Sequence, residues 1–310
     1  MRDRLKPEIA VAIVYVAAMF VNILDSTVVT VALPTLSREF DVTTSGIEWV
    51  VTGYLLSLAV FIPASGWIGD RVGTKRTFLF AIAVFTAASA LCGIATSLNE
   101  LIAFRILQGV GGGMLTPTGY AMLMRAFPPE RRAAASKVLI IPTAIAPASG
   151  PIVGGFLVDW LSWRWVFYVN LPLGIATFIF GWIFLHESRE PNVGRFDFPG
   201  FVLSGGGLAL ILFALSEGPM HGWSSPLAWG SGLAGALAFI GLVVFELRIE
   251  HPMLQLRLIG DRLFRQAMLT STFSTASFLG LLFVMPLFLQ EARGISAIQS
   301  GLTTFPEAIG

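Results

Sequence analysis

The feature that most constrains this chain is a series of apolar runs, each long enough to cross a lipid bilayer. Nine such runs cover residues 10–33, 49–68, 77–96, 101–122, 138–158, 165–185, 198–215, 227–245 and 267–289, and a tenth begins near residue 297. A helix rises 1.5 Å per residue, so about 20 apolar residues span the hydrocarbon core. Membrane strands would instead alternate over about 10 residues. The sequence therefore predicts an all-α integral membrane protein.

Composition agrees with this fold class and excludes several functions. The chain has 310 residues, of which 55% are hydrophobic and 13% are charged, against about 25% charged in soluble domains. A net charge of +1 provides no basic surface for nucleic acid. Cys92 is the single cysteine, which excludes an internal disulfide and a cysteine metal cluster. We predict neither a cofactor nor a metal.

The basic residues predict the orientation of the helices. With a cytoplasmic N-terminus, 16 of the 20 Lys and Arg residues fall in inner segments and three in outer ones. Because basic residues gather on the cytoplasmic side, we predict a multi-pass protein of the cell (inner) membrane with its N-terminus in the cytoplasm. The inner segment 248–266 mixes apolar and basic residues. It either lies on the membrane surface or is an ordinary basic connector.

Asp25 is the only charged residue in the first run. An acidic residue at the centre of a membrane helix costs about 2.5 to 3.5 kcal/mol on insertion scales. Such acids usually face the interior of a bundle, where they take part in moving ions or protons. The alternative is an acid that only bonds a neighbouring helix.

Arg105 is a second charge inside a run, and its expected depth differs from that of Asp25 by about 6 Å. An arginine side chain bridges that distance, and pairing would offset part of the cost of burying both charges. A change in their separation would then change the proton affinity of the acid. We therefore predict that Asp25 and Arg105 form a proton-coupling pair. Alternatively, Arg105 extends to the outer interface without a partner.

Glycines near Arg105 have a simpler interpretation than a nucleotide loop. Gly109, Gly111, Gly112 and Gly113 lie inside an apolar run, without a preceding strand. They indicate close packing of helices.

The turn after the second run combines glycines with charges: Gly66, Asp70, Arg71, Gly73 and Lys75. The glycines permit a tight turn, and the basic residues hold it on the inner side. A topogenic turn alone would explain a basic loop. The spacing, however, resembles the signature between helices two and three of the major facilitator superfamily.

Two further signatures of that family follow in the expected order. The residues similar to the family's fourth-helix motif are Leu101, Arg105, Gln108, Gly109 and Gly111. The residues similar to its fifth-helix antiporter motif are Gly150, Pro151, Gly154 and Gly155, with Ala146 in place of the leading glycine. A plain packing kink at the prolines of this run is the alternative interpretation.

Residues 24–34 are similar to the first-helix motif of the fourteen-helix drug:proton antiporters, and residues 163–172 resemble the start of helix six in that branch. The resemblance implies a major facilitator N-terminal six-helix bundle in residues 1–190 and two linker helices in 191–262. It also implies the start of a truncated second bundle in 263–310.

The same resemblance implies a proton-coupled secondary transporter that exports drugs or other small organic compounds by alternating access. Its expected partners are a small-molecule substrate, protons and the lipid bilayer. Glu48, Tyr54 and Thr27 are candidates for the substrate path, although Glu48 is more simply a charge at the membrane interface.

The sequence bears on two other classes of protein. A membrane enzyme would need clustered nucleophiles, bases or ligands, yet His186, His221 and His251 are scattered outside the runs. We therefore predict that the chain is not an enzyme. A non-transporting remnant, or a subunit that needs a partner chain with the missing C-terminal helices, remains the alternative to an exporter.

Overall fold

The computed structural model describes residues 6–131, 135, 137, 140–190, 193–250, 252–294 and 303. The first helices are α1 (Pro7–Glu39), α2 (Thr44–Val72), α3 (Thr74–Ile94), α4 (Leu98–Ala126), the short turn η2 (Pro129–Arg131), α6 (Ile140–Trp160), α7 (Trp165–Tyr168) and α8 (Asn170–Phe184). The later ones are α9 (Phe198–His221), α10 (Pro226–Glu246), η3 (Leu256–Gly260), α11 (Arg262–Leu287) and η4 (Phe288–Ala292).

Within the described residues, six helical stretches are long and apolar enough to cross a membrane, judged by length and composition. They are Pro7–Glu39, Gly46–Val72, Thr74–Ile94, Trp165–Phe184, Phe198–Pro219 and Pro226–Glu246. The helices α4, α6 and α11 have 29, 21 and 26 residues, which also suffice in length at 1.5 Å per residue. The predicted all-α membrane fold is confirmed for this part of the chain.

Polar caps explain why several helices extend beyond their apolar runs. The Thr43 side chain accepts from the Gly46 amide before α2, and the Ser97 side chain accepts from Glu100 before α4. Such caps bond amides that have no partner within the helix. Asp261 caps α11 in the same way. The inner segment expected at residues 248–266 therefore ends at Asp261. Its last residues, 262–266, already belong to α11.

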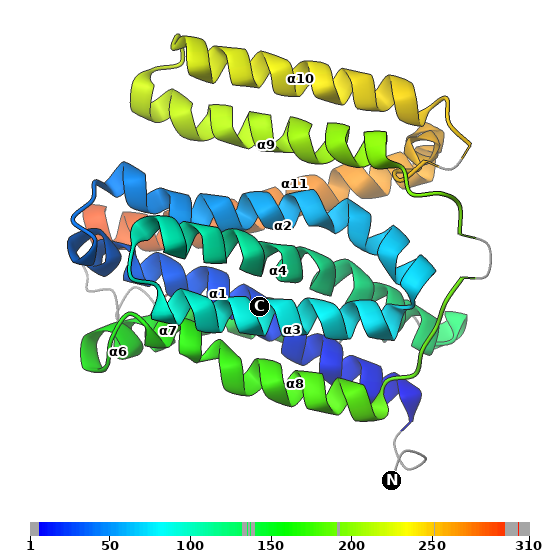
Figure 1. The fold of residues 1–310 in the computed structure, drawn as a ribbon, viewed down its shortest axis with the longest axis horizontal. Helices are drawn as coiled ribbons and strands as arrows, with labels where there is room; N and C mark the ends of the chain where they lie inside the picture. Colours follow the sequence, from blue (N-terminus) through cyan, green and yellow to red (C-terminus); the bar gives the residue numbers. More distant parts are fainter. Residues whose placement is uncertain are drawn as a thin grey trace.

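The first six long helices form one bundle, with α4 between α2 and α3, and α1 against α6 and α8 (Figure 1). Glycines allow α4 to approach its neighbours closely. A Cβ on Gly113 would lie 2.4 Å from the Leu58 carbonyl oxygen, and one on Gly111 would lie 2.6 Å from that of Ala81. The predicted packing role of these glycines is confirmed.

The run predicted as a single sixth span is one helical stretch, Trp165–Phe184. The elements α7 and α8 meet at Val169, whose φ of −59° and ψ of −26° are those of a right-handed helix. The Val169 amide donates to the Trp165 carbonyl at 3.0 Å. Pro172 has no amide proton for a bond to the preceding turn. Asn170 therefore lies in a continuous span, directly after the junction of α7 and α8.

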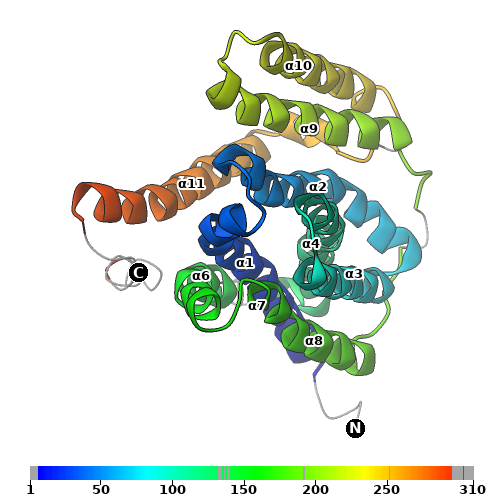
Figure 2. The ribbon, with the colours of Figure 1, turned by 60° about the vertical axis from the view of Figure 1, so that its left-hand side comes forward.

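The helices α9 and α10 form a hairpin that lies on α2, outside the bundle (Figures 1 and 2). A Cβ on Gly205 of α9 would lie 2.8 Å from Cγ1 of Val60. The rings of Trp49 and Phe213 add a contact with centroids 5.7 Å apart. Figure 2 shows α11 running out to one side of the bundle.

Candidate functional site

The buried site is built around the carboxylate of Asp25, near the middle of α1. Arg105 of α4 donates from Nη1 to Asp25 Oδ2 at 2.6 Å, and both side chains are 0% exposed. The structure thus brings together the two charges that the sequence places inside apolar runs. Arg105 does not extend to an interface. The pair lies within the bundle, where each charge offsets part of the cost of burying the other.

Arg105 is fixed by contacts to three other residues. Its Nε donates to the Val50 carbonyl of α2 at 3.1 Å, and Nη1 also donates to Gln108 Oε1 at 2.8 Å. The guanidinium lies over the Tyr54 ring, 4.0 Å from its centroid. These contacts use the planar, multi-donor geometry that distinguishes arginine from lysine.

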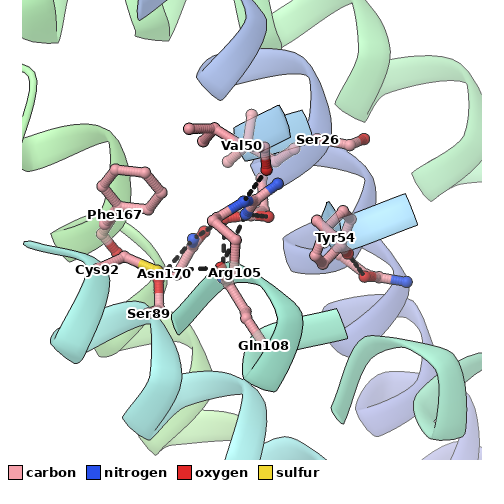
Figure 3. Close-up of polar contacts among 12 residues, drawn as sticks. Ser26, Val50, Tyr54, Ser89, Cys92, Arg105, Gln108, Phe167 and Asn170 are labelled. Carbon is pink, nitrogen blue, oxygen red and sulfur yellow. Dashed lines mark hydrogen bonds and ion pairs between the residues drawn. The ribbon is translucent and has the colours of Figure 1, made fainter. Parts of the chain in front are cut away.

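The other oxygen of Asp25 receives two amide donors, Gln108 and Asn170, whose side chains are labelled beside Arg105 in Figure 3. Gln108 Nε2 donates to Oδ1 at 2.9 Å, and Asn170 Nδ2 of α8 donates to the same oxygen at 2.7 Å. Asn170 Nδ2 also donates to Ser89 Oγ of α3 at 3.0 Å. The cluster therefore connects α1, α2, α3, α4 and α8 through one carboxylate.

The sequence analysis did not assign Gln108 or Asn170 to this site, although both lie in the family-like segments. Gln108 follows Arg105 by three positions, so the two share a helix face. That spacing was an available signal. Asn170 is 145 positions from Asp25, and no local pattern links the two.

Three donors occupy the two oxygens of this buried carboxylate, and a carboxyl proton would need one of those oxygens as its site. Proton uptake by Asp25 therefore requires its bonds to rearrange. Two polar atoms in the cluster have unused hydrogen-bonding capacity. Arg105 Nη2 and Asn170 Oδ1 are buried and have no hydrogen-bond partner among the described residues.

The candidates for the substrate path are dispersed. Tyr54 is buried, and its hydroxyl donates to Asn22 Oδ1. Its ring packs against the Arg105 guanidinium and does not face an open surface. Thr27 bonds the backbone of its own helix, to Leu24 at 3.0 Å. Glu48 is exposed in the first turns of α2, apart from the Asp25 cluster.

The fifth-helix motif divides between two faces of α6. A Cβ on Gly150 would lie 2.0 Å from Thr27 Oγ1, and one on Gly154 would lie 3.1 Å from the Val28 carbonyl oxygen. Pro151 is exposed, and a Cβ on Gly155 would meet no described atom within 4 Å. Two of the four residues therefore pack α6 against α1.

In the loop motif, Asp70 forms an ion pair that extends beyond the motif. Arg125, at the end of α4, lies 2.7 Å from Asp70 Oδ1 and 3.2 Å from Glu190 Oε1. The Glu190 amide donates to the Asp70 carbonyl at 3.2 Å. Arg125 and Glu190 connect the loop to α4 and to the segment after α8, and neither was predicted from the sequence.

The remaining loop residues have separate roles. Gly73 has φ +114°, a conformation that favours glycine, and a Cβ there would lie 2.3 Å from Glu187 Oε1. Lys75 Nζ donates to the carbonyls of Trp182 and Leu185 at 2.7 Å each, which places a cation at the C-terminal end of α8. Gly66 and Arg71 are exposed.

Comparisons with known proteins identify the family. The Major Facilitator Superfamily model matches residues 15–309. The chain is 38% identical over 290 residues to a "Multidrug resistance protein B homolog" of Mycobacterium tuberculosis, an alignment that covers 92% of this chain and 53% of the relative. It is 37% identical over 297 residues to a "Putative multidrug resistance protein MdtD" of Serratia proteamaculans, with 94% and 61% covered. The chain thus spans about half to three fifths of the length of these relatives.

A solved structure shows the same fold. The human organic anion transporter MFSD10 superposes with a TM-score of 0.62 at 17% identity, over 98% of this chain and 70% of that one. The predicted membership of a transporter family, rather than an enzyme family, is confirmed by these matches. This chain is a multi-pass membrane protein that belongs to the Major Facilitator Superfamily.

Proposed function

We propose that this chain is the N-terminal portion of a proton-coupled exporter of drugs or other small organic compounds, which works by alternating access. Two relatives of the chain carry multidrug resistance names, which supports export of small molecules. Their greater length supports a requirement for further helices to complete the transport path. The 16 to three split of basic residues supports an inner-membrane protein with a cytoplasmic N-terminus.

The observation that carries the proposal is the ion pair of Asp25 with Arg105, which is 0% exposed on both sides. An acid at this depth is expensive to keep charged, and three side chains, Arg105, Gln108 and Asn170, donate hydrogen bonds to it. Proton uptake cancels the negative charge and weakens the hold on the guanidinium. Arg105 Nη2, which lacks a partner among the described atoms, then gives the released arginine a donor for another acceptor.

This chemistry couples a proton to a change of helix contacts. Arg105 bonds α1 through Asp25 and α2 through the Val50 carbonyl, so its release loosens α4 from both helices. Alternating access needs such a change to be linked to rocking of the bundle. In the proposed cycle, substrate favours the arrangement in which Asp25 is ionised, and binding of substrate therefore releases a proton.

Proton release on substrate binding tests the proposal in the intact transporter that contains residues 1–310. Tetraphenylphosphonium, a bulky apolar cation, is added to the purified protein in weakly buffered detergent solution, and a pH dye records proton release. We expect release from the wild type and none from Asp25→Asn, which keeps the size of the side chain. Equal release from both proteins would refute Asp25 as the coupling acid.

A second candidate function is a subunit that needs a partner chain. The observation that favours it is α11, which runs out from the bundle (Figure 2) with Leu263 77% exposed and Phe273 69% exposed. Helices from a partner would cover such side chains. Co-purification of the chain with a membrane partner from its native host, in stoichiometric amount, would favour this candidate over a single-chain exporter.

A further inference from the structure

Asn170 connects Asp25 to a helix that begins far along the chain. Its side chain is 0% exposed, and its Nδ2 donates to Asp25 Oδ1 at 2.7 Å and to Ser89 Oγ at 3.0 Å. Ser89 Oγ donates in turn to the Phe167 carbonyl at 2.9 Å. Both protons of the amide nitrogen are therefore used in a buried chain of bonds from α1 through α3 to the residues before α8.

The oxygen of the same amide is in the opposite situation. Asn170 Oδ1 is buried and has no hydrogen-bond partner among the described residues. Leaving a buried polar atom unpaired costs about 1 to 3 kcal/mol. An ionised carboxylate only accepts hydrogen bonds, so it turns the nitrogen side of the amide toward Asp25. With the nitrogen facing Asp25, the oxygen of the amide is left unpaired.

A protonated Asp25 needs an acceptor, because its carboxyl group then carries a donor. Arg105 offers donors only. Gln108 Oε1 already accepts from Arg105 Nη1 at 2.8 Å. Among the side chains that contact Asp25, Asn170 has the acceptor with open capacity. A half turn of χ2, about the Cβ–Cγ bond of Asn170, brings Oδ1 to the carboxyl group, and this torsion is soft and nearly two-fold.

We propose that Asn170 is a positioning residue that reads the protonation state of Asp25, with its amide nitrogen on the carboxylate and its amide oxygen on the protonated acid. The proposal rests on the proposed role of Asp25 as the proton carrier. Turning the amide also withdraws Nδ2 from Ser89. Proton uptake on α1 therefore changes a contact between α3 and the start of α8.

Few other charges act on Asp25. The titratable side chains that interact electrostatically within the cluster are Arg105 from α4, Tyr54 from α2 and Cys92 from α3. The helix α8 has no titratable residue over its length. On α6 and α7 the titratable residues are Asp159, which is exposed, and Tyr168, which packs against Gly93. A neutral substitution at Asn170 therefore acts on Asp25 through the hydrogen bond.

Infrared difference spectroscopy tests the proposal on the 310-residue chain in lipid nanodiscs. The carbonyl band of a protonated carboxyl group is followed against pH, and the Asp25 band is assigned as the one missing in Asp25→Asn. The test variants are Asn170→Ala and the nearly isosteric Asn170→Leu, which are both neutral and have no N–H donor. Ser89→Ala is the matched control, because it removes one bond of Asn170 and keeps the 2.7 Å bond to Asp25.

We expect the midpoint of the Asp25 band to move to higher pH by about one unit in both Asn170 variants, a tenfold rise in proton affinity. The control is expected to shift by less than about a third of that amount. In Asn170→Ala the band should also change frequency, since the protonated acid loses its acceptor.

Three outcomes would contradict the proposal, and they separate it from the proposed function. An unchanged midpoint in both variants overturns the role of Asn170 and leaves Asp25 as a titrating acid. A shift in Ser89→Ala equal to that in Asn170→Ala also overturns it, because general loosening of the cluster would then explain the effect. Absence of any pH-dependent Asp25 band in the wild type overturns both proposals.

Discussion

Gly150 of α6 lies directly against Thr27 of α1, so that a Cβ on the glycine would stand 2.0 Å from Thr27 Oγ1. The threonine hydroxyl is held in place by bonds to the carbonyls of Ile23 and Leu24 at 3.2 and 3.0 Å. It therefore cannot turn aside without losing them. The two helices fit at this distance only because position 150 has no side chain.

Gly150→Ala is expected to lower the stability of the bundle by about 1 to 3 kcal/mol, the usual cost of an extra methyl group in a filled space. The measurement is the thermal unfolding midpoint in detergent. Gly155→Ala is the control, since its Cβ would meet no described atom within 4 Å and it brings the same gain in helix propensity. Equal midpoints for the two variants would contradict the packing role of Gly150.

Arg105→Ala is expected to destabilise the protein by about 3 to 5 kcal/mol, because it leaves a buried carboxylate without its cation. The double variant Asp25→Asn with Arg105→Gln has no charge at either position. Its loss of stability should therefore be smaller than that of Arg105→Ala alone. Denaturant unfolding in mixed micelles measures both. A double variant that is less stable than the single one would show that the charges themselves hold the helices together.

The orientation of the chain is tested by labelling single cysteines in intact cells. With Cys92 replaced by serine, Arg71→Cys should be protected from an impermeant thiol reagent, whereas Asn99→Cys should react. Both positions are exposed, so burial does not explain a difference. The predicted excess of basic residues on the cytoplasmic side is the physical reason. Labelling of position 71 and protection of position 99 would reverse the orientation.

Expression of residues 1–310 alone is expected to give no proton-driven efflux, because alternating access needs two bundles that move about a shared site. Ethidium accumulation in cells without their main efflux pumps is the measurement. Co-expression of the C-terminal helices of the longer protein should lower accumulation, and Asp25→Asn in the same pair of chains serves as the inactive control. Strong efflux by the short chain alone would contradict the requirement for a second bundle.

The sequence allowed the helical fold and part of the buried cluster to be predicted, for the same reason. Charges such as Asp25 and Arg105 are so costly in lipid that their isolation within apolar runs marks them. Their depths then indicated that they could meet. The packing glycines of α4 were also predictable, since glycine in an apolar helix has few other uses.

Neutral polar partners were not predictable in this way. An amide such as that of Asn170 costs less to bury than a charge, so its position in the sequence is less conspicuous. Its bond to Asp25 depends on how α8 packs against α1 and α3, which no local sequence pattern reveals. Arg125 and Glu190 escaped notice because charged residues at the ends of helices are ordinary, and only the packing of α2, α4 and the segment after α8 brings them together.

The hairpin of α9 and α10 has a consequence for the surroundings of α2. A helix at the edge of a bundle is normally in contact with lipid chains, whose length and composition vary between membranes. Along α2, Gly205 and Phe213 of the hairpin occupy that place. One flank of the bundle thus carries a covalently attached substitute for its lipid shell. Along these contacts α2 faces protein rather than lipid chains, so its surroundings there do not change with the composition of the membrane.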